Sequence, residues 1–239
     1  SGAPIVFAMN IGGYTSSAIN AEQPGGMPGG GMPPGGGAPP AGAGGVESGS
    51  GAQMSAGKHI ELGDYALASG LVVVNPGARG RDNVNADGVY FGKAPAAIVD
   101  LKAAVRYLKA NSGVVPGNTD RIVSSGSSAG GALSVLLEAS GGSDLYQKDL
   151  VALGAADASD VIYAVAGYCP ITDLENADAG YEWCFGDATN ETVSVNATAS
   201  EELRARFPRY MERLGLKDDQ GRKLTADNLA EHMLSVHLR

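Results

Sequence analysis

The sequence predicts an α/β fold, in which a mostly parallel β-sheet carries helices on both of its faces. Two observations support this prediction. Apolar segments of strand length alternate with amphipathic helical patterns along most of the chain, which is the order of βα units. The chain is also 44% hydrophobic, which is enough to bury a substantial core.

The first two predicted strands lie on either side of a long segment that contains a Gly- and Pro-rich stretch. Residues 4–9 are apolar and predict a short buried strand, which runs directly into a glycine turn at 10–14. The segment 65–70 is typical of a helix end that is closed by Gly70. The apolar run 71–74 then predicts the second strand.

The clearest helical pattern covers residues 95–110, with Pro95 near its start. Residues 120–125 then predict a strand, 129–139 a second amphipathic helix and 161–167 a further strand. The apolar residues that share one face of the first helix are Ile98, Leu101, Val105 and Leu108.

The C-terminal part of the chain has a different composition. Residues 187–200 are polar and predict a loop. Apolar residues recur at helical spacing over 203–214, with an interruption expected at Pro208. A further helix is predicted over 225–238, opening with Thr225 as its cap. This part predicts a helical appendage to the sheet domain.

These patterns divide the chain into two predicted domains. Residues 1–186 form the sheet domain, which contains a low-complexity insert at 24–45 with 11 glycines and 6 prolines. That insert lacks the side chains to hold itself in place, so we expect a surface excursion or a linker. Residues 187–239 form the start of the helical domain.

Charge and cysteine content exclude several classes of protein. The 239 residues include 17 Lys and Arg against 26 Asp and Glu, a formal charge of −9, and nonspecific nucleic-acid binding needs basic patches instead. The first residues have no charged or apolar region typical of a signal peptide, and a mature or trimmed terminus would look the same. No apolar run approaches the roughly 18 residues of a membrane span. Cys169 and Cys184 exclude a disulfide-rich scaffold and a four-ligand zinc ribbon, and they leave one disulfide or two free thiols open.

The candidate nucleophile is Ser128, in the pattern Gly-x-Ser-x-Gly at 126–130. The pattern lies between a predicted strand and a Leu-rich helix, which is the setting that a nucleophile elbow requires. Small residues at both ends let strand and helix pass closely. Ser128 Oγ would attack an acyl carbon, and the Ala129 amide at the helix N-terminus would stabilise the oxyanion. The alternative is an ordinary helix-capping serine in a tight turn.

A second oxyanion donor is expected after the first strand, at Gly12-Gly13. Glycine lets an amide point inward without a Cβ in the way. The alternative for this pair is an ordinary turn.

The sequence offers no convincing general base. The three histidines are His59, which precedes Ser128, and His232 and His237, which lie on a helical pattern with no strand before them. We interpret these three as surface or appendage residues. The base and its acid partner are therefore expected in sequence outside this chain.

Four short motifs occur in order along the chain. They include Gly-Gly-Tyr at 12–14, Gly-Lys-Ala-Pro-Ala at 92–96, Gly-x-Ser-x-Gly-Gly at 126–131 and Tyr-Cys-Pro-Ile at 168–171. In these motifs, and most densely over 79–183, the chain resembles the bacterial tannases (tannin acyl hydrolases), which are serine esterases of the α/β-hydrolase fold.

The resemblance implies a fold, a mechanism and a partner. Ser128 is implied as the nucleophile, the Gly13 and Ala129 amides as oxyanion donors, and Ile171 as a residue that flanks the galloyl ring of a phenolic ester. Residues 187–239 would begin a lid domain. The implied mechanism uses no metal and no organic cofactor, and substrates of tannin size favour a secreted or cell-surface location.

The resemblance also has limits along this chain. The insert at 24–45 matches no feature of the family, and no position matches the triad Asp and His, which follow the lid there. We therefore expect the chain to be one piece of a larger enzyme that supplies the missing strands, the base and the acid.

Three interpretations remain open at this point. A feruloyl-type or general carboxylesterase would keep the chemistry and change the substrate. A non-catalytic binding protein of the same fold would lack the triad altogether. Arg79 and Arg81 could hold a substrate carboxylate, although a salt-bridged turn is the favoured interpretation.

Overall fold

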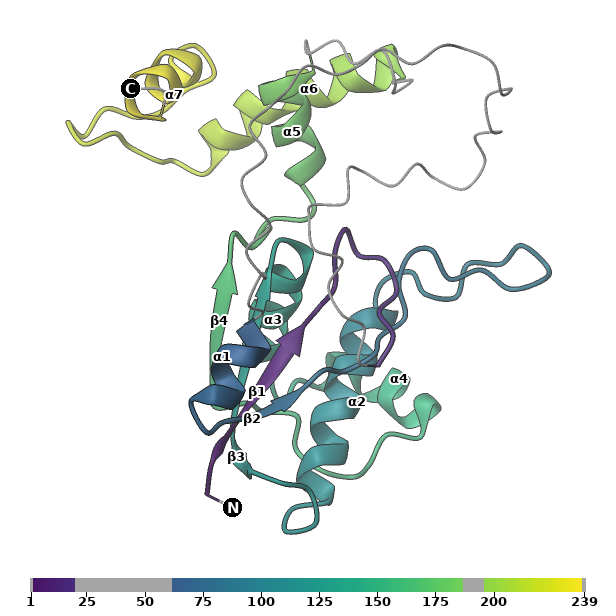
Figure 1. Cartoon of the computed structure of the whole chain (residues 1–239). Coiled ribbons are helices and arrows are strands. Elements are labelled where there is room, and N and C mark those ends of the chain that lie inside the picture. The colour runs from purple at the N-terminus through teal and green to yellow at the C-terminus, as the bar shows by residue number, and fades with distance from the viewer. Residues whose placement is uncertain (1, 20–61, 187–195, 238–239) are drawn as a thin grey trace, which may run out of the picture. The chain divides into compact units, whose positions relative to one another are not determined.

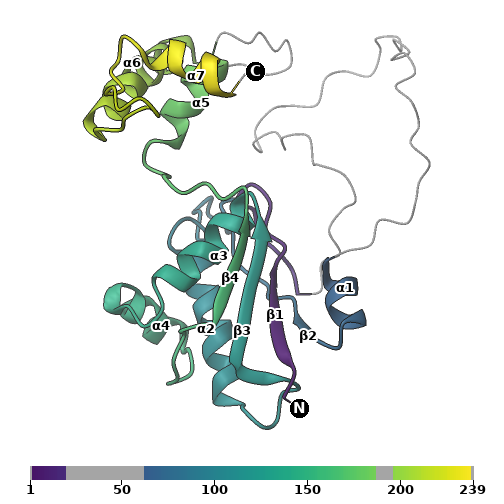
Figure 2. The ribbon, with the colours of Figure 1, turned by 90° about the vertical axis from the view of Figure 1, so that its left-hand side faces the viewer.

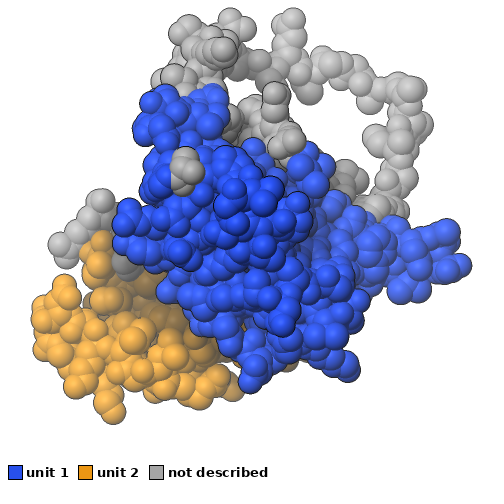
Figure 3. Space-filling view, turned by 90° about the horizontal axis from the view of Figure 1, so that it is seen from below, with its two compact units in different colours: residues 1–170 blue, residues 171–239 orange. Residues whose placement is uncertain are grey.

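The chain forms two compact units. A computed structural model describes residues 2–19, 62–186 and 196–237. Unit 1 covers residues 1–170 and unit 2 covers residues 171–239, coloured blue and orange in Figure 3. The Gly/Pro-rich insert lies outside the described residues.

Unit 1 is built on a single parallel sheet, which confirms the predicted α/β fold (Figure 1). Its strands are β1 (Pro4–Met9), β2 (Val72–Val74), β3 (Asn118–Ser127) and β4 (Ala164–Tyr168). They are arranged in the order β2-β1-β3-β4, and every neighbouring pair is parallel.

The register brings the carboxyl ends of three strands to one edge of the sheet. Met9 at the end of β1 lies opposite Gly126 of β3, and Ser127 lies opposite Tyr168 at the end of β4. In open α/β sheets, ligands bind in the crevice outside these carboxyl ends. The turns that follow β1, β3 and β4 are therefore the places to look for chemistry.

Helices cover both faces of the sheet. They are α1 (Leu62–Ala68), α2 (Ala96–Ala110) and α3 (Ala129–Ala139). Helix α4 (Gln147–Leu153) and a short 3₁₀ turn (Asp144–Tyr146) pack together, and α4 also packs on α2. Figure 2 shows α2 and α3 on one face and α1 on the other. The helices predicted over 95–110 and 129–139 are confirmed, because their apolar faces do form the interface with the sheet.

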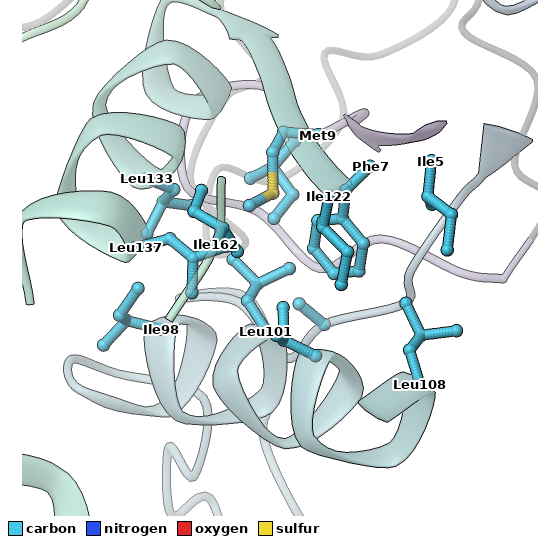
Figure 4. Packing of buried hydrophobic residues seen from close by; sticks show 13 residues of the cluster. Ile5, Phe7, Met9, Ile98, Leu101, Leu108, Ile122, Leu133, Leu137 and Ile162 are labelled. Carbon is cyan, nitrogen blue, oxygen red and sulfur yellow. The ribbon is translucent and has the colours of Figure 1, made fainter. Parts of the chain in front are cut away.

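The hydrophobic core lies between the sheet and the helices α2 and α3 (Figure 4). Strand residues such as Phe7 and Ile122 are fully buried and face Leu101 of α2 and Leu137 of α3. Each fully buried side chain of this size contributes about 1.5–3 kcal/mol. The core thereby fixes where β1 and β3 end, and so where the turns after them lie.

Unit 2 is helical. It contains α5 (Ala177–Phe185), α6 (Ala197–Arg213) and α7 (Leu229–His237). Helices α5 and α6 pack together through aromatic side chains, with the ring centroids of Trp183 and Phe207 5.4 Å apart. Because α5 packs on α6, it groups with unit 2, whereas the sequence placed it in a domain ending at 186; that domain assignment stays a prediction.

Several predicted boundaries differ from those observed. The helix expected from 203 begins at Ala197, because the Asn196 side chain accepts a hydrogen bond from Ala199 N and caps the helix six residues earlier. Pro208 does not interrupt that helix, which continues to Arg213.

Two further boundaries shift by a few residues. The last helix begins at Leu229 rather than at Thr225, whose backbone N–H donates to the Asn228 side chain in a turn that precedes α7. Strand β4 begins at Ala164 rather than at 161. Among the described residues, no helix is long and apolar enough to cross a membrane.

Candidate active site

Ser128 occupies the single residue between strand β3 and helix α3. Its backbone has φ 55° and ψ −120°, a combination that a non-glycine residue adopts only at an energetic cost. Two hydrogen bonds hold it there: Ser128 N donates to Tyr168 O at 3.0 Å, and Ser128 O accepts from Ala132 N at 2.9 Å. The side chain is exposed, as a nucleophile elbow requires.

The glycines around Ser128 are required by close packing. A Cβ on Gly126 would lie 2.6 Å from the backbone of Gly130, and a Cβ on Gly130 would lie 2.5 Å from Met9 O. A Cβ on Gly131 would lie 2.6 Å from Tyr168 O. These contacts are shorter than a methyl group tolerates, so the sharp turn exists only with hydrogen at all three positions.

The loop that follows β1 begins beside this turn. Ile11 O lies 3.2 Å from the position of a Cβ on Gly130, so the backbone after β1 packs against the first turn of α3. The loop then turns sharply at Gly13 (φ 57°), with Thr15 N and Thr15 Oγ1 both donating to Gly12 O. The loop after β1 thus starts beside the first turn of α3, and the role of Gly13 as an oxyanion donor stays a prediction.

Two backbone donors near Ser128 are unused. Neither Gly13 N nor Ala129 N donates a hydrogen bond to any residue that the structure describes. Ala129 is the first residue of α3, where the N–H groups have no intrahelical partner and the helix dipole is positive. A free N–H at this place can stabilise an oxyanion.

The segment after β2 holds the loop after β1. Ser17 and Ala78 exchange two backbone hydrogen bonds of 2.9 Å, and Arg81 N donates to Tyr14 O at 2.8 Å. The Asp82 carboxylate accepts from Ser16 N at 2.5 Å and from Ser16 Oγ at 2.7 Å. Burial raises the pKa of Asp82, but the Ser16 hydrogen bonds outweigh it and hold that pKa below its usual value.

These features agree with the comparisons with known proteins. The BD-FAE family model matches residues 53–205, which is more than half of the chain and includes both the β2–α2 segment and the turn at Ser128. The chain belongs to the BD-FAE family of α/β-hydrolases. Comparison with curated proteins gave no significant match.

Solved structures extend the BD-FAE match to almost the whole chain. The crystal structure of Fusobacterium nucleatum tannase is 38% identical with a TM-score of 0.63, over 94% of this chain and 46% of the tannase. The native tannin acyl hydrolase from Lactobacillus plantarum is 36% identical with a TM-score of 0.64, over 94% of this chain and 45% of the enzyme. A tannin acyl hydrolase in complex with ethyl gallate is 36% identical with a TM-score of 0.63, over 94% of this chain and 45% of that enzyme.

The resemblance to bacterial tannases is thus confirmed. This BD-FAE chain spans less than half of the length of the tannase structures that it matches.

Arg79 and Arg81, in the segment after β2 of this BD-FAE chain, have different surroundings. Arg79 forms an ion pair with Asp100 through both Nε and Nη2, with a shortest distance of 2.7 Å, and its backbone N also donates to that carboxylate. Hydrogen bonding to Asp100 raises the pKa of Arg79, although burial opposes it. Arg79 therefore takes part in a salt bridge within the fold, as the favoured interpretation predicted. Arg81 forms no side-chain hydrogen bond or ion pair with the described residues.

The remaining candidates lie elsewhere in the BD-FAE chain. Ile171 is half-buried and is the first residue of unit 2, and its contact with the substrate ring stays a prediction. His232 is half-buried in α7, while His59 lies outside the described residues. Cys169, in unit 1, and Cys184, in unit 2, are both free, exposed thiols.

Among the hollows that the described residues of unit 1 form, two have been delineated, and Ser128 lines neither of them. One, of about 580 Å³, is lined mainly by residues 74–79, at and after the end of β2, and by residues of α2 such as Leu108. The other, of about 320 Å³, lies between Lys93 and the α4 residue Leu153. Within the described part of the chain, no group of three or more His, Cys, Asp or Glu side chains could hold a metal ion.

Sequence reasoning missed the role of Ser16 and Asp82 in holding the loop after β1. The signal was present, because Asp82 follows the apolar run 71–74 and residues after a parallel strand lie at the carboxyl edge of the sheet. What the sequence could not show is that the partner comes from the loop after β1, 66 residues earlier.

Proposed function

We propose that this chain supplies the nucleophile and the oxyanion donors of a serine ester hydrolase that cleaves galloyl or related phenolic esters. The observation that carries the proposal is the exposed, strained Ser128 between β3 and α3. A capping serine has no need of φ 55°, whereas a nucleophile that must stand clear of a tight turn does.

The proposed reaction has two halves. Ser128 Oγ attacks the ester carbonyl carbon while its proton passes to a general base, and the negative charge on the carbonyl oxygen is stabilised by Gly13 N–H and Ala129 N–H. The C–O bond then breaks, and the alcohol leaves with the proton that the base returns. Water next attacks the acyl-serine, which releases the carboxylic acid and restores the Ser128 hydroxyl. We expect the base and its acid partner from sequence outside this chain.

The proposed substrate class rests on the relatives. The matching structures include a tannin acyl hydrolase in complex with ethyl gallate and one in complex with 3,4-dihydroxybenzoate. In this proposal Ile171 flanks the phenolic ring, and residues 187–239 begin a lid over it. The reaction as written needs no metal and no organic cofactor.

A test of the nucleophile uses the complete natural protein. Changing Ser128→Ala is expected to lower kcat for ethyl gallate by at least about a thousandfold, because a missing nucleophile leaves only binding and oxyanion stabilisation. A fluorophosphonate probe should label the parent protein and not the variant. Ser127→Ala, which removes a neighbouring exposed hydroxyl, is the matched control and should still be labelled.

The outcomes distinguish the alternatives. Absence of labelling in the parent protein would favour a non-catalytic binding protein of this fold. Labelling with a preference for ferulate or p-nitrophenyl acetate esters over gallate esters would keep the mechanism and replace the galloyl substrate by that of a feruloyl-type or general carboxylesterase.

A further inference from the structure

Arg81 places a positive charge beside the proposed oxyanion donor. Its Nη2 lies 3.9 Å from the position that a Cβ on Gly13 would take. The backbone N of Arg81 donates to Tyr14 O, so the side chain starts from a point that is fixed relative to the loop after β1. The side chain is exposed, and no hydrogen bond or ion pair with a described residue uses its guanidinium.

The carboxylates in this region are already occupied. Asp100 accepts two side-chain donors of Arg79, and Asp82 accepts the backbone and hydroxyl of Ser16. Asp82 is next to Arg81 in sequence, and its interaction with Arg81 is through space only. The Arg81 guanidinium is therefore available to a ligand, whereas that of Arg79 is used within the fold.

We propose that Arg81 is a specificity-determining residue, which binds an anionic group on the departing alcohol portion of the ester. This inference rests on the proposed function. A guanidinium forms two parallel hydrogen bonds with a carboxylate, and this geometry makes arginine a selective partner for that group.

The exposure of Arg81 points to the alcohol portion of the substrate. The acyl portion stays bonded to Ser128 until water enters, so it needs a sheltered place. The alcohol portion must leave into solvent, and an exposed side chain beside the proposed oxyanion donor is accessible to a group that does so. Esters whose alcohol portion carries a carboxylate are the substrates that this residue would favour.

The test compares two esters in the complete natural protein. 3-Carboxyphenyl gallate carries a negative charge on the leaving group at pH 7, and 3-carbamoylphenyl gallate has a similar shape without the charge. The parent protein is expected to show a kcat/KM about three- to tenfold higher for the charged ester, as for an ion pair strengthened by bidentate geometry. Arg81→Gln should bring the ratio close to one.

Two further variants separate specific binding from general effects. Arg81→Lys keeps the charge but loses the paired donors, so it should retain part of the preference. Arg121→Gln makes the same change of charge at an exposed position in β3, away from the carboxyl edge, and should leave the ratio at the parent value. The preference of the parent should also fall as salt is added, because salt screens exposed charges.

A second measurement does not depend on turnover. 3-Hydroxybenzoate, the alcohol released from the charged ester, should inhibit the parent competitively, and its inhibition constant should rise in Arg81→Gln by the same factor as the ratio falls. An unchanged ratio in Arg81→Gln, or an equal fall in Arg121→Gln, would overturn the role of Arg81 while Ser128-dependent hydrolysis stands. Hydrolysis that survives Ser128→Ala would instead overturn the proposed function itself.

Discussion

The conformation of Ser128 shows how one residue depends on its neighbours. A backbone at φ 55° and ψ −120° costs of order 1–3 kcal/mol and persists only where surrounding contacts enforce it. Here the contacts are those of Tyr168 and Ala132 with the serine backbone, together with the close approach of Gly126 and Gly130. The Ser128 hydroxyl is thus exposed because these hydrogen bonds and close glycine contacts hold the backbone in this conformation.

This dependence predicts the effect of a methyl group at residue 130. In Gly130→Ala the new Cβ would lie 2.5 Å from Met9 O, so β1 and α3 must separate. We expect the free energy of unfolding to fall by about 1–3 kcal/mol, as for other overpacked sites, and labelling of Ser128 by a fluorophosphonate to be lost. Urea unfolding and probe labelling would measure both effects.

The matched control for this substitution is Gly12→Ala. A Cβ there would meet no atom within 4 Å, and residue 12 does not have a positive φ. We expect a change in the free energy of unfolding below about 0.5 kcal/mol. Equal losses in the two variants would show that the close packing at Gly130 is not what supports the turn.

At the scale of elements, a buried ion cluster joins helix α2 to the chain between α3 and β4. Lys102 of α2 is fully buried, and its Nζ lies 3.1 Å from Asp160 and 2.6 Å from Ser140 O. Asp160 is 1% exposed and also accepts from Arg106 Nε at 2.9 Å and from Gly142 N at 2.8 Å. Each buried charge therefore has partners, which is the condition for tolerating it inside a protein.

The ion cluster predicts a dependence of stability on pH. Burial raises the pKa of Asp160, but the hydrogen bonds from Gly142, Lys102 and Arg106 outweigh it and hold the pKa below its usual value. A lowered pKa in the folded state means that the contribution to stability is complete above the unfolded pKa of about 3.9 and is lost as pH falls through the folded value.

Asp160→Asn should remove that contribution at neutral pH. The substitution leaves the Lys102 charge buried without its carboxylate partner, so we expect the free energy of unfolding to fall by about 3–5 kcal/mol. The variant should also lose part of the parent's acid sensitivity below pH 4. Urea unfolding of both proteins at several pH values would measure this, with the exposed Asp157→Asn as the control. Parallel pH profiles for the parent and Asp160→Asn would contradict the prediction.

The elements that could be predicted from sequence are those whose pattern is local. The helix over 95–110 was predictable because its apolar residues recur on one face, and the Ser128 turn because glycines flank it between a strand and a helix. The start of α6 was not, because its cap is a single asparagine in a polar stretch, Asn196. The different environments of Arg79 and Arg81 were not predictable either, because Asp100 joins Arg79 only in the folded chain.

For the whole molecule, the two units differ in what the sequence explains. Unit 1 has the parallel sheet, the core and the turn with Ser128, and each follows from hydrophobic periodicity and glycine placement. Unit 2 depends on contacts between distant residues, such as the Tyr210 hydroxyl with the Asp173 carboxylate, that no local pattern indicates. Hydrogen bonding from Tyr210 lowers the pKa of Asp173, so that carboxylate is held in its charged form.

At the same scale, removal of residues 24–45 should leave the proposed chemistry intact. The loop after β1 is fastened to the segment after β2 before residue 20, through Ser17 and Ala78. We expect a protein without 24–45 to be labelled at Ser128 within about twofold of the parent rate, since loop length itself costs little free energy. Retained circular dichroism with lost labelling would show that the insert takes part in the site.

The bridge between Ser17 and Ala78 has a consequence for how such a protein can diverge. The loop after β1 is joined to the segment after β2 by this bridge, between two described parts of the chain that end at Ile19 and begin again at Leu62. Insertions or deletions between Ile19 and Leu62 can then accumulate during evolution, and new surface functions can arise there, without displacing the loop after β1.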